Sequence, residues 1–447
     1  MRSLGAATAY GALLTSAGLP FGISFGLFNT FFPVFIRNFP AVPPARHAAC
    51  LANLNLAFVL GALACCLSGG VLMERWGRRR SLLVVLALEV VALCVQALPS
   101  LAVATAMRVP IGYACCFWTF LVPVLVRETF PFRLANWIAP LFGIFYAVGM
   151  LLGFFCCFEW MQRWAWMVLA WPVLLELPKL ILFATVLDME SPVWLAACQA
   201  PVTQLSANFG KLYDAAEAGR LARELADCRE KRKTRRAESL SDLLTDGNAT
   251  RLFVPVLLNL LSRLSGINFF TFYSRLLFEE LQLARPIQLT MAIGVANLLA
   301  TLALPFLAVA FGRKTVMSGG LFGLSAAYCL VLGGRWLDSS LAKSAGFFLY
   351  MMSYAISLGG LLPIYCADLL PPVVLAGCAT FQWALIAFFA RYSLDIFRRF
   401  EIHHVFLVCQ LATTLGGLLF VALGIETRGK TDEAIAEEFR RKGFFTH

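Results

Sequence analysis

Charged residues are scarce in this chain. Asp, Glu, Lys and Arg make up 14% of its 447 residues, whereas hydrophobic types make up 60%. A soluble domain carries about 25% charged residues to cover its surface, and a disordered chain needs a still more polar composition. Both classes are therefore excluded, and the composition indicates a chain whose solvent is the lipid bilayer.

Sequence signatures of enzymes and metal sites are also missing. We find no Walker loop, no G-x-S-x-G nucleophile turn and no cysteines at zinc-binding spacing. Many of the 14 cysteines stand in apolar doublets such as Cys65–Cys66, which indicates small apolar side chains inside helices. The sequence therefore predicts no enzyme, no metal site and no cofactor.

The excess of basic residues needs a different explanation from nucleic-acid binding. A formal charge of +11 would suggest a nucleic-acid partner for a soluble protein. Here, however, Lys and Arg stand in short clusters between long apolar runs, as in loops beside an anionic lipid leaflet. We therefore expect the lipid bilayer as a partner and no nucleic acid.

Charges and turn residues divide the apolar sequence into segments that can each cross a membrane as a helix. A spanning helix needs about 20 apolar residues. The sequence therefore predicts an all-α membrane protein with twelve transmembrane spans: 9–36, 51–73, 81–98, 101–126, 136–158, 164–187, 251–279, 287–311, 315–332, 342–366, 373–393 and 402–424.

The basic clusters predict how these spans are oriented. Residues 75–80, residues 231–236 and the pair Arg313–Lys314 all fall on one side of the membrane, whereas Arg398 and Arg399 fall on the other. The positive-inside rule makes the first side cytoplasmic and places both termini there. We expect the plasma membrane rather than an internal membrane, and a monomer.

Three polar motifs occur twice, in the same order and at a nearly constant separation. They contain Gly77 and Gly312, Glu128 and Asp368, and Glu190 and Glu426. A repeat of this length indicates two parallel six-helix halves that rock around a solute bound between them. The predicted organisation is a first half (1–187), a loop with short amphipathic helices (188–250), a second half (251–424) and a tail (425–447).

The repeated motifs combine acids and bases at the predicted cytoplasmic helix ends. We interpret them as an ion-pair network that holds the cytoplasmic side shut while the other side is open. The alternative is that each charge is solvated or touches lipid headgroups. The predicted gate residues are Glu74, Arg75, Gly77, Arg78, Arg79, Glu128, Glu190, Arg313, Asp368 and Glu426.

The same motifs resemble those of the sugar porter family of the major facilitator superfamily. The loop G-x-x-x-(D/N)-R-x-G-R-R is matched from Gly70 to Arg79, and P-E-S-P-R-W-L is matched at 190–195. The helix-seven motif Q-Q-L-S-G-I-N is matched at 264–268, and the C-terminal P-E-T-(K/R)-G-(K/R)-T at 426–431. The resemblance implies the major facilitator fold, and a hexose or related sugar as the transported solute.

The resemblance also implies which residues bind the solute, and here the chain departs from the family. Ser262 and Arg263 stand where the family has two sugar-binding glutamines, and Gly143 replaces another. Two sugar-contacting asparagines carry over. The implied substrate-binding residues are Ser262, Arg263, Asn268, Asn297, Gln382 and Trp383.

Proton coupling is not expected from the first span. Proton-coupled members of the family carry an aspartate within F-G-Y-D, whereas this chain has Phe21-Gly22-Ile23-Ser24. Serine does not titrate near neutral pH. This difference favours a uniporter that works by facilitated diffusion, although Glu89 offers another proton site.

Charges inside the predicted spans leave two questions open. Arg263 either binds an anionic substrate, such as a sugar acid or organic anion, or pairs with a helix carboxylate or backbone carbonyls. Glu89 and Arg108 lie at similar depth in one helical hairpin, which predicts an intramembrane pair. A receptor that binds a nutrient without transporting it remains a further alternative.

Overall fold

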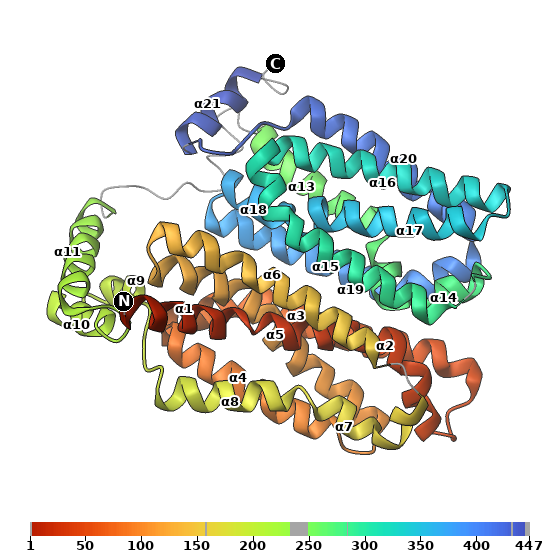
Figure 1. The fold of residues 1–447 in the computed structure, drawn as a ribbon, viewed down its shortest axis with the longest axis horizontal. Coiled ribbons are helices and arrows are strands. Elements are labelled where there is room, and N and C mark those ends of the chain that lie inside the picture. The colour runs from red at the N-terminus through yellow and green to blue at the C-terminus, as the bar shows by residue number, and fades with distance from the viewer. Residues whose placement is uncertain (1, 157–158, 233–248, 284, 431, 443–447) are drawn as a thin grey trace.

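The computed structural model describes residues 2–156, 159–232, 249–283, 285–430 and 432–442, and these residues are helical throughout apart from turns and loops. Figure 1 shows two layers of long, roughly parallel helices. The first half, red to yellow, lies below the second half, green to blue. The end of the bundle that carries Gly77 and Gly312 is called the motif end below, and the opposite end the far end.

The first half consists of long helices and two short 3₁₀ segments. Its first predicted span is interrupted between Thr15 and Gly18. The elements are α1 (Arg2–Thr15), α2 (Gly18–Phe35), η1 (Ile36–Asn38), α3 (Pro44–Trp76), α4 (Arg78–Gln96), α5 (Leu101–Thr129), α6 (Phe132–Phe155), η2 (Glu159–Trp164), α7 (Ala165–Ala170) and α8 (Val173–Thr185).

The connection between the halves contains three short helices at the motif end, on the left of Figure 1. They are α9 (Pro192–Ala197), α10 (Val202–Phe209) and α11 (Ala215–Arg232). Lys231 and Arg232 of the predicted basic cluster lie in α11, whereas the rest of that cluster, within residues 233–248, lies outside the described residues.

The second half repeats the arrangement and contains two interrupted spans. Its elements are α13 (Ala249–Leu264), α14 (Ile267–Glu280), α15 (Pro286–Phe311), α16 (Arg313–Trp336), α17 (Ser340–Tyr354), the π-helical turn η3 (Ala355–Gly359), α18 (Leu361–Leu369), α19 (Pro372–Arg399), α20 (Ile402–Leu423) and α21 (Asp432–Lys442).

Eleven helical segments of the described chain are long and apolar enough to cross a membrane. The third predicted span, occupied by α4, is not among them. This helix begins with Arg78, Arg79 and Arg80 and contains Glu89, and these charges lower its mean hydropathy. It nevertheless packs along α5 and α8 within the first half.

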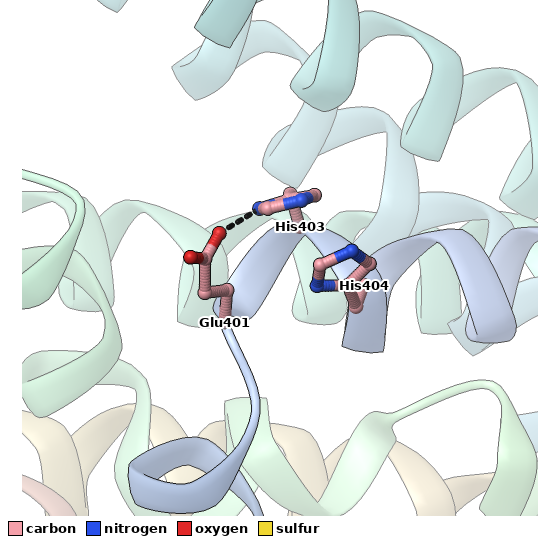
Figure 2. Close-up of side chains that lie close together, drawn as sticks. All are labelled: Glu401, His403 and His404. Carbon is pink, nitrogen blue, oxygen red and sulfur yellow. Dashed lines mark ion pairs between the residues drawn. The ribbon is translucent and has the colours of Figure 1, made fainter.

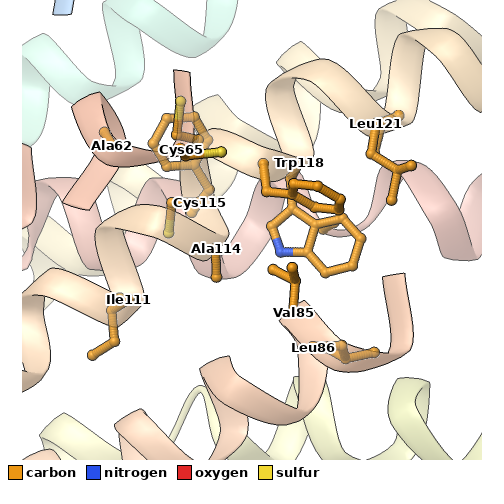
Figure 3. Close-up of a cluster of buried hydrophobic side chains, with 14 of the residues drawn as sticks. Ala62, Cys65, Val85, Leu86, Ile111, Ala114, Cys115, Trp118 and Leu121 are labelled. Carbon is orange, nitrogen blue, oxygen red and sulfur yellow. The ribbon is translucent and has the colours of Figure 1, made fainter. Parts of the chain in front are cut away.

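The buried apolar residues form two core clusters, one within the second half and one that is built mainly from the first half and also takes in Phe272, Tyr273, Trp383, Ile386 and Ala390 of the second. In the first half, Trp118 and Cys115 of α5 pack with Val85 of α4 and Cys65 of α3 (Figure 3). Glycines also let helices approach closely, because a Cβ on Gly22 of α2 would lie 2.1 Å from the Tyr146 carbonyl oxygen of α6. This packing makes each half a body that can move as a unit.

The halves meet along three helix pairs: α3 with α19, α6 with α15, and α2 with α14. Near the far end, Asn29 of α2 donates hydrogen bonds to the Thr271 carbonyl (3.0 Å) and to Ser274 Oγ (2.7 Å) of α14. Phe25 packs against Phe272 beside these bonds, with ring centroids 5.0 Å apart. The far end is therefore closed by contacts between α2 and α14.

Candidate functional site

The polar residues predicted from the seventh span lie on either side of a helix break in the second half. Helix α13 ends at Leu264 and α14 starts again after Gly266, whose φ of +81° favours glycine. The break frees the carbonyl of Ser265, which accepts hydrogen bonds from Tyr328 Oη (2.6 Å) and Tyr350 Oη (2.8 Å). The two tyrosine hydroxyl groups thus supply the hydrogen bonds that this carbonyl needs inside an apolar bundle, which stabilises the helix break.

Arg263 is the centre of a buried polar cluster at this break. Its side chain donates to Ser262 Oγ (2.6 Å), Tyr354 Oη (3.0 Å) and Asn268 Oδ1 (3.3 Å). All four residues are buried, and Arg263 is only 7% exposed. We call Ser262, Arg263, Asn268 and Tyr354 the arginine cluster. Three of its members were predicted from the sequence.

Tyr354 was missed, although a tyrosine hydroxyl inside an apolar span was a visible signal. It ends α17 immediately before the π-helical turn η3, and its ring stacks on Tyr350 with centroids 6.3 Å apart. Turns of π-helix re-aim side chains and are common at functional sites. Here the turn follows the residue whose hydroxyl group contacts Arg263.

The first half faces this cluster with Tyr146 of α6, which sequence reasoning also missed. Tyr146 lies within electrostatic range of both Arg263 and Tyr354. Gly143, one turn earlier, faces the second half, because a Cβ built there would lie 3.8 Å from Thr301 Cγ2 of α15. The first half therefore presents the Tyr146 ring on this side, one turn from a glycine that lies against Thr301.

The other predicted substrate residues do not join the cluster. Asn297 and Gln382 are half-buried, on α15 and α19 respectively, and no side-chain hydrogen bond links either to Arg263 in the described structure. Trp383 is 8% exposed and packs with the hydrophobic core of the first half. Trp383 lies on α19, the helix that packs against α3 of the first half.

A cavity of about 260 Å³ leads from Arg263 towards the far end. Its lining contains no carboxylate and comprises Arg263, Leu264, Phe269, Phe389, Ile396, Phe400, His404, Val405, Val408 and Cys409. At its rim, Glu401 accepts from His403 (3.0 Å), and the His403 and His404 rings lie 3.9 Å apart (Figure 2). Glu401 is mainly exposed, so these groups lie in contact with solvent.

At the motif end, the predicted gate residues form one network in each half. In the first half, Arg78 donates to Glu128 through Nε (3.1 Å) and Nη2 (2.9 Å). Glu190 accepts from the backbone N–H groups of Arg78 (2.8 Å) and Arg79 (3.0 Å) and so caps α4. Ser191 Oγ donates to Glu128 and links the two carboxylates.

The second half repeats this network with different residues. Arg313 pairs with Asp368, and Glu426 accepts from the backbone N–H groups of Arg313 (2.9 Å) and Lys314 (3.0 Å). Thr427 Oγ1 donates to Asp368 (2.7 Å), as Ser191 does to Glu128. Desolvation raises the pKa of Glu426, but hydrogen bonds from backbone N–H groups outweigh it, so this pKa lies below its ordinary value.

The turn glycines and the remaining gate residues differ in their surroundings. Gly77 and Gly312 have φ angles of +83° and +82°, and a Cβ on either would lie 2.5 Å from the capping carboxylate. Arg79 pairs with Asp188 (3.0 Å). Glu74 and Arg75 are exposed, and their side chains form no ion pair within the described residues. The paired gate residues therefore brace each half internally.

The predicted Glu89–Arg108 pair does not form. Glu89 accepts a hydrogen bond from Trp118 Nε1 (2.8 Å) and lies near Glu176 and Lys179 of α8. Arg108 donates to the Ser24 carbonyl (2.7 Å) and lies over the Phe58 ring, 4.5 Å from its centroid. Glu89 contacts α5 and α8, whereas Arg108 contacts α2 and α3, so the two side chains point to different neighbours.

Sequence and structure comparisons agree with this architecture. Residues 12–439 match the family described as Sugar (and other) transporter. The mouse solute carrier family 2 facilitated glucose transporter member 2 is 25% identical over 411 residues, which cover 86% of this chain and 76% of that protein. Member 4 from Homo sapiens is 27% identical over 425 residues, covering 90% and 82%.

Solved structures show the fold. The inward-open xylose transporter XylE from E. coli has a TM-score of 0.78 at 18% identity, covering 96% of this chain and 99% of that chain. The human organic anion transporter MFSD10 has a TM-score of 0.63 at 16% identity, covering 92% and 98%. The fold is thus the all-helical major facilitator fold, and this multi-pass membrane protein belongs to the sugar (and other) transporter family.

Proposed function

We propose that the protein moves a hexose or a related sugar across the membrane by alternating access. The observation that carries this proposal is the arginine cluster, a set of buried polar groups beside the interface between two rocking halves. Polar groups are expensive inside a membrane protein and are typically retained where a solute passes. The similarity to facilitated glucose transporters supports a sugar-like solute.

We further propose that transport is uniport. Ser24, at the position where proton-coupled members carry an aspartate, contributes only its backbone carbonyl to Arg108. Arg108 therefore has a fixed neutral partner in place of a titratable one. A proton ionophore is expected to leave initial uptake unchanged in energised vesicles, and abolished uptake would establish proton coupling instead.

The decisive experiment is equilibrium counterflow in proteoliposomes. Vesicles are preloaded with an unlabelled solute from a panel of hexoses and hexuronates, and the same labelled solute is added outside. Transient accumulation without an ion gradient is expected for at least one solute. Protein that stays folded and binds a panel solute, but gives no counterflow, would be a receptor rather than a transporter.

The sidedness and assembly follow from the sequence and belong to the same proposal. Both termini lie on the cytoplasmic side of the plasma membrane, with the motif end facing the cytoplasm, and the protein acts as a monomer. The basic residues gathered at the motif end support this orientation. Protease protection of epitope tags at either terminus in sealed cells tests it.

A further inference from the structure

Arg263 is a buried cation without an acidic partner. Its three hydrogen-bond partners are two hydroxyl groups and one amide oxygen, all neutral. The ion pairs of the described chain include none to Arg263, and its Nε is buried without any hydrogen bond. A buried charge of this kind is costly unless something neutralises it. The end of α13 offsets part of that cost, because a helix C-terminus favours a cation.

A second unpaired donor lies beside the first. Asn268 Oδ1 accepts a hydrogen bond from Arg263 Nη1, and Asn268 Nδ2 is buried without a partner. The two residues are thus joined, and each retains one nitrogen whose N–H groups have no acceptor. Unsatisfied buried donors are rare in proteins and call for an acceptor group. Two adjacent donors, one of them charged, suit a carboxylate, which offers two acceptor oxygens.

A cavity beside Arg263, whose lining comes from the second half, has room for the ring that carries such a group. Its lining contains no carboxylate, the Glu401 carboxylate at its rim accepts from His403, and His404 in the lining adds a further hydrogen-bonding group. Its volume of about 260 Å³ falls just below the roughly 300–1,000 Å³ of pockets for drug-sized ligands, which suits a single sugar ring. Aromatic rings of Phe269 and Phe389 supply apolar walls for the face of that ring.

We propose that the transported solute is a sugar acid, a hexuronate-like ring whose carboxylate accepts from Arg263 Nε and Asn268 Nδ2. This inference rests on the proposed function and narrows its substrate. One guanidinium neutralises one negative charge, so a carboxylate monoanion fits better than a phosphate ester with about −1.5 to −2 charges. The sugar ring would lie between Phe269 and Phe389, and His404 in the same lining would offer a hydrogen-bonding group to its hydroxyl groups.

The test compares glucuronate, glucose and glucose 6-phosphate by counterflow in the same proteoliposomes. Glucuronate is expected to be preferred about 10- to 100-fold over glucose, as one charged hydrogen-bond pair implies. Arg263→Gln is expected to abolish that preference. Arg391→Gln is the matched control, because Arg391 is an exposed arginine of α19 paired with Asp395, and the variant should behave like wild type.

A second variant keeps the test valid if Arg263→Gln fails to fold. Asn268→Asp replaces the amide with a carboxylate of nearly the same shape. The new carboxylate lies beside Arg263 and imitates that of the bound substrate. It should raise the melting temperature of the empty protein and reduce glucuronate uptake at least tenfold. Unchanged glucuronate uptake in Asn268→Asp would overturn the inference.

The outcomes separate the inference from the function on which it rests. Counterflow of glucose with no preference for glucuronate would leave a sugar transporter and remove the sugar-acid assignment. A preference for glucose 6-phosphate over glucuronate would also remove it. Absence of counterflow for all three solutes, in protein that unfolds cooperatively, would refute the proposed function itself.

Discussion

Arg78 and Glu128 are joined by two hydrogen bonds between α4 and the end of α5, and Arg313 joins Asp368 at the equivalent place in the second half. Neither pair connects one half to the other. Alternating access requires the halves to move as units, and these pairs fix helices within each unit. We infer that these pairs brace each half and leave the proposed rocking motion to the interface.

Breaking the first brace should therefore destabilise the protein. Glu128→Gln removes a two-point charged contact from a mostly buried site and should cost about 1.5–3 kcal/mol. Arg75→Gln is the control, because Arg75 is exposed and unpaired within the described residues, so its effect should stay within about 0.5 kcal/mol. Thermal unfolding in detergent measures both. Equal losses in the two variants would contradict the bracing role.

Closure of the far end depends on Asn29. Asn29→Ala removes the hydrogen bonds to Thr271 and Ser274 and should raise the population of the state with the far end open by about tenfold, if roughly 1.4 kcal/mol is lost. Hydrogen exchange of the α14 amides should accelerate accordingly. Asn38→Ala, which loses only a bond to the nearby Phe35 carbonyl, should leave α14 unchanged. Unaltered exchange in Asn29→Ala would place the closing contact elsewhere.

Lys179 neutralises Glu176 in the core of the first half, where both side chains are almost fully buried. Lys179→Met should cost about 3–5 kcal/mol, because it leaves a buried carboxylate uncompensated beside Glu89. Adding Glu176→Gln should recover most of that loss. Unfolding of the single and double variants measures the recovery, and a double variant no more stable than Lys179→Met would disprove the pairing.

Exchanging the charges of Glu89 and Arg108 should not rescue either single change, because the two residues have separate partners. Glu89 should instead be coupled to Trp118. A double-mutant cycle with Glu89→Gln and Trp118→Phe should give an interaction free energy of about 0.5–3 kcal/mol. Zero coupling in that cycle would contradict the contact between Glu89 and Trp118, and rescue by the charge exchange would restore the pair expected from the sequence.

Acid should weaken the second half through Glu426. Its pKa is depressed in the folded state, so its contribution to stability is present above the unfolded pKa of about 4.3 and is lost as the pH falls through the folded pKa. The melting temperature of Glu426→Gln should therefore depend less on pH below about 5 than that of wild type. Glu401→Gln, at an exposed site, should keep the wild-type profile.

The sequence predicted the fold well because its signals were long and repeated. Apolar runs of membrane length and motifs that occur twice determine a two-half helical bundle with little dependence on detail. The sequence also predicted a span over 81–98, and α4 lies there, but it starts at Arg78 and includes arginines that were expected in the preceding loop. Its charges cluster at one end, where they form part of the motif network.

The site was only partly predictable, because helical spacing gives depth along a helix but not the neighbour that a side chain faces. Glu89 and Arg108 illustrate this limit, since a pairing was predicted from their spacing and each side chain has a different partner. Tyr354 illustrates another limit. It lies on α17 and contacts Arg263 of α13, next to a π-helical turn that no sequence pattern predicted. Ser262, Arg263 and Asn268 were found together because they are local in sequence.

The caps on α4 and α16 have a consequence for how the chain is made. The carboxylate that caps α4 belongs to Glu190, which is synthesised 112 residues after Arg78, and Glu426 follows Arg313 by 113 residues. The start of each third helix therefore stays without its cap until the sixth helix of that half has left the ribosome. The cap in each half can therefore form only after the last helix of that half has been inserted. The first half can complete its cap before the second half is translated.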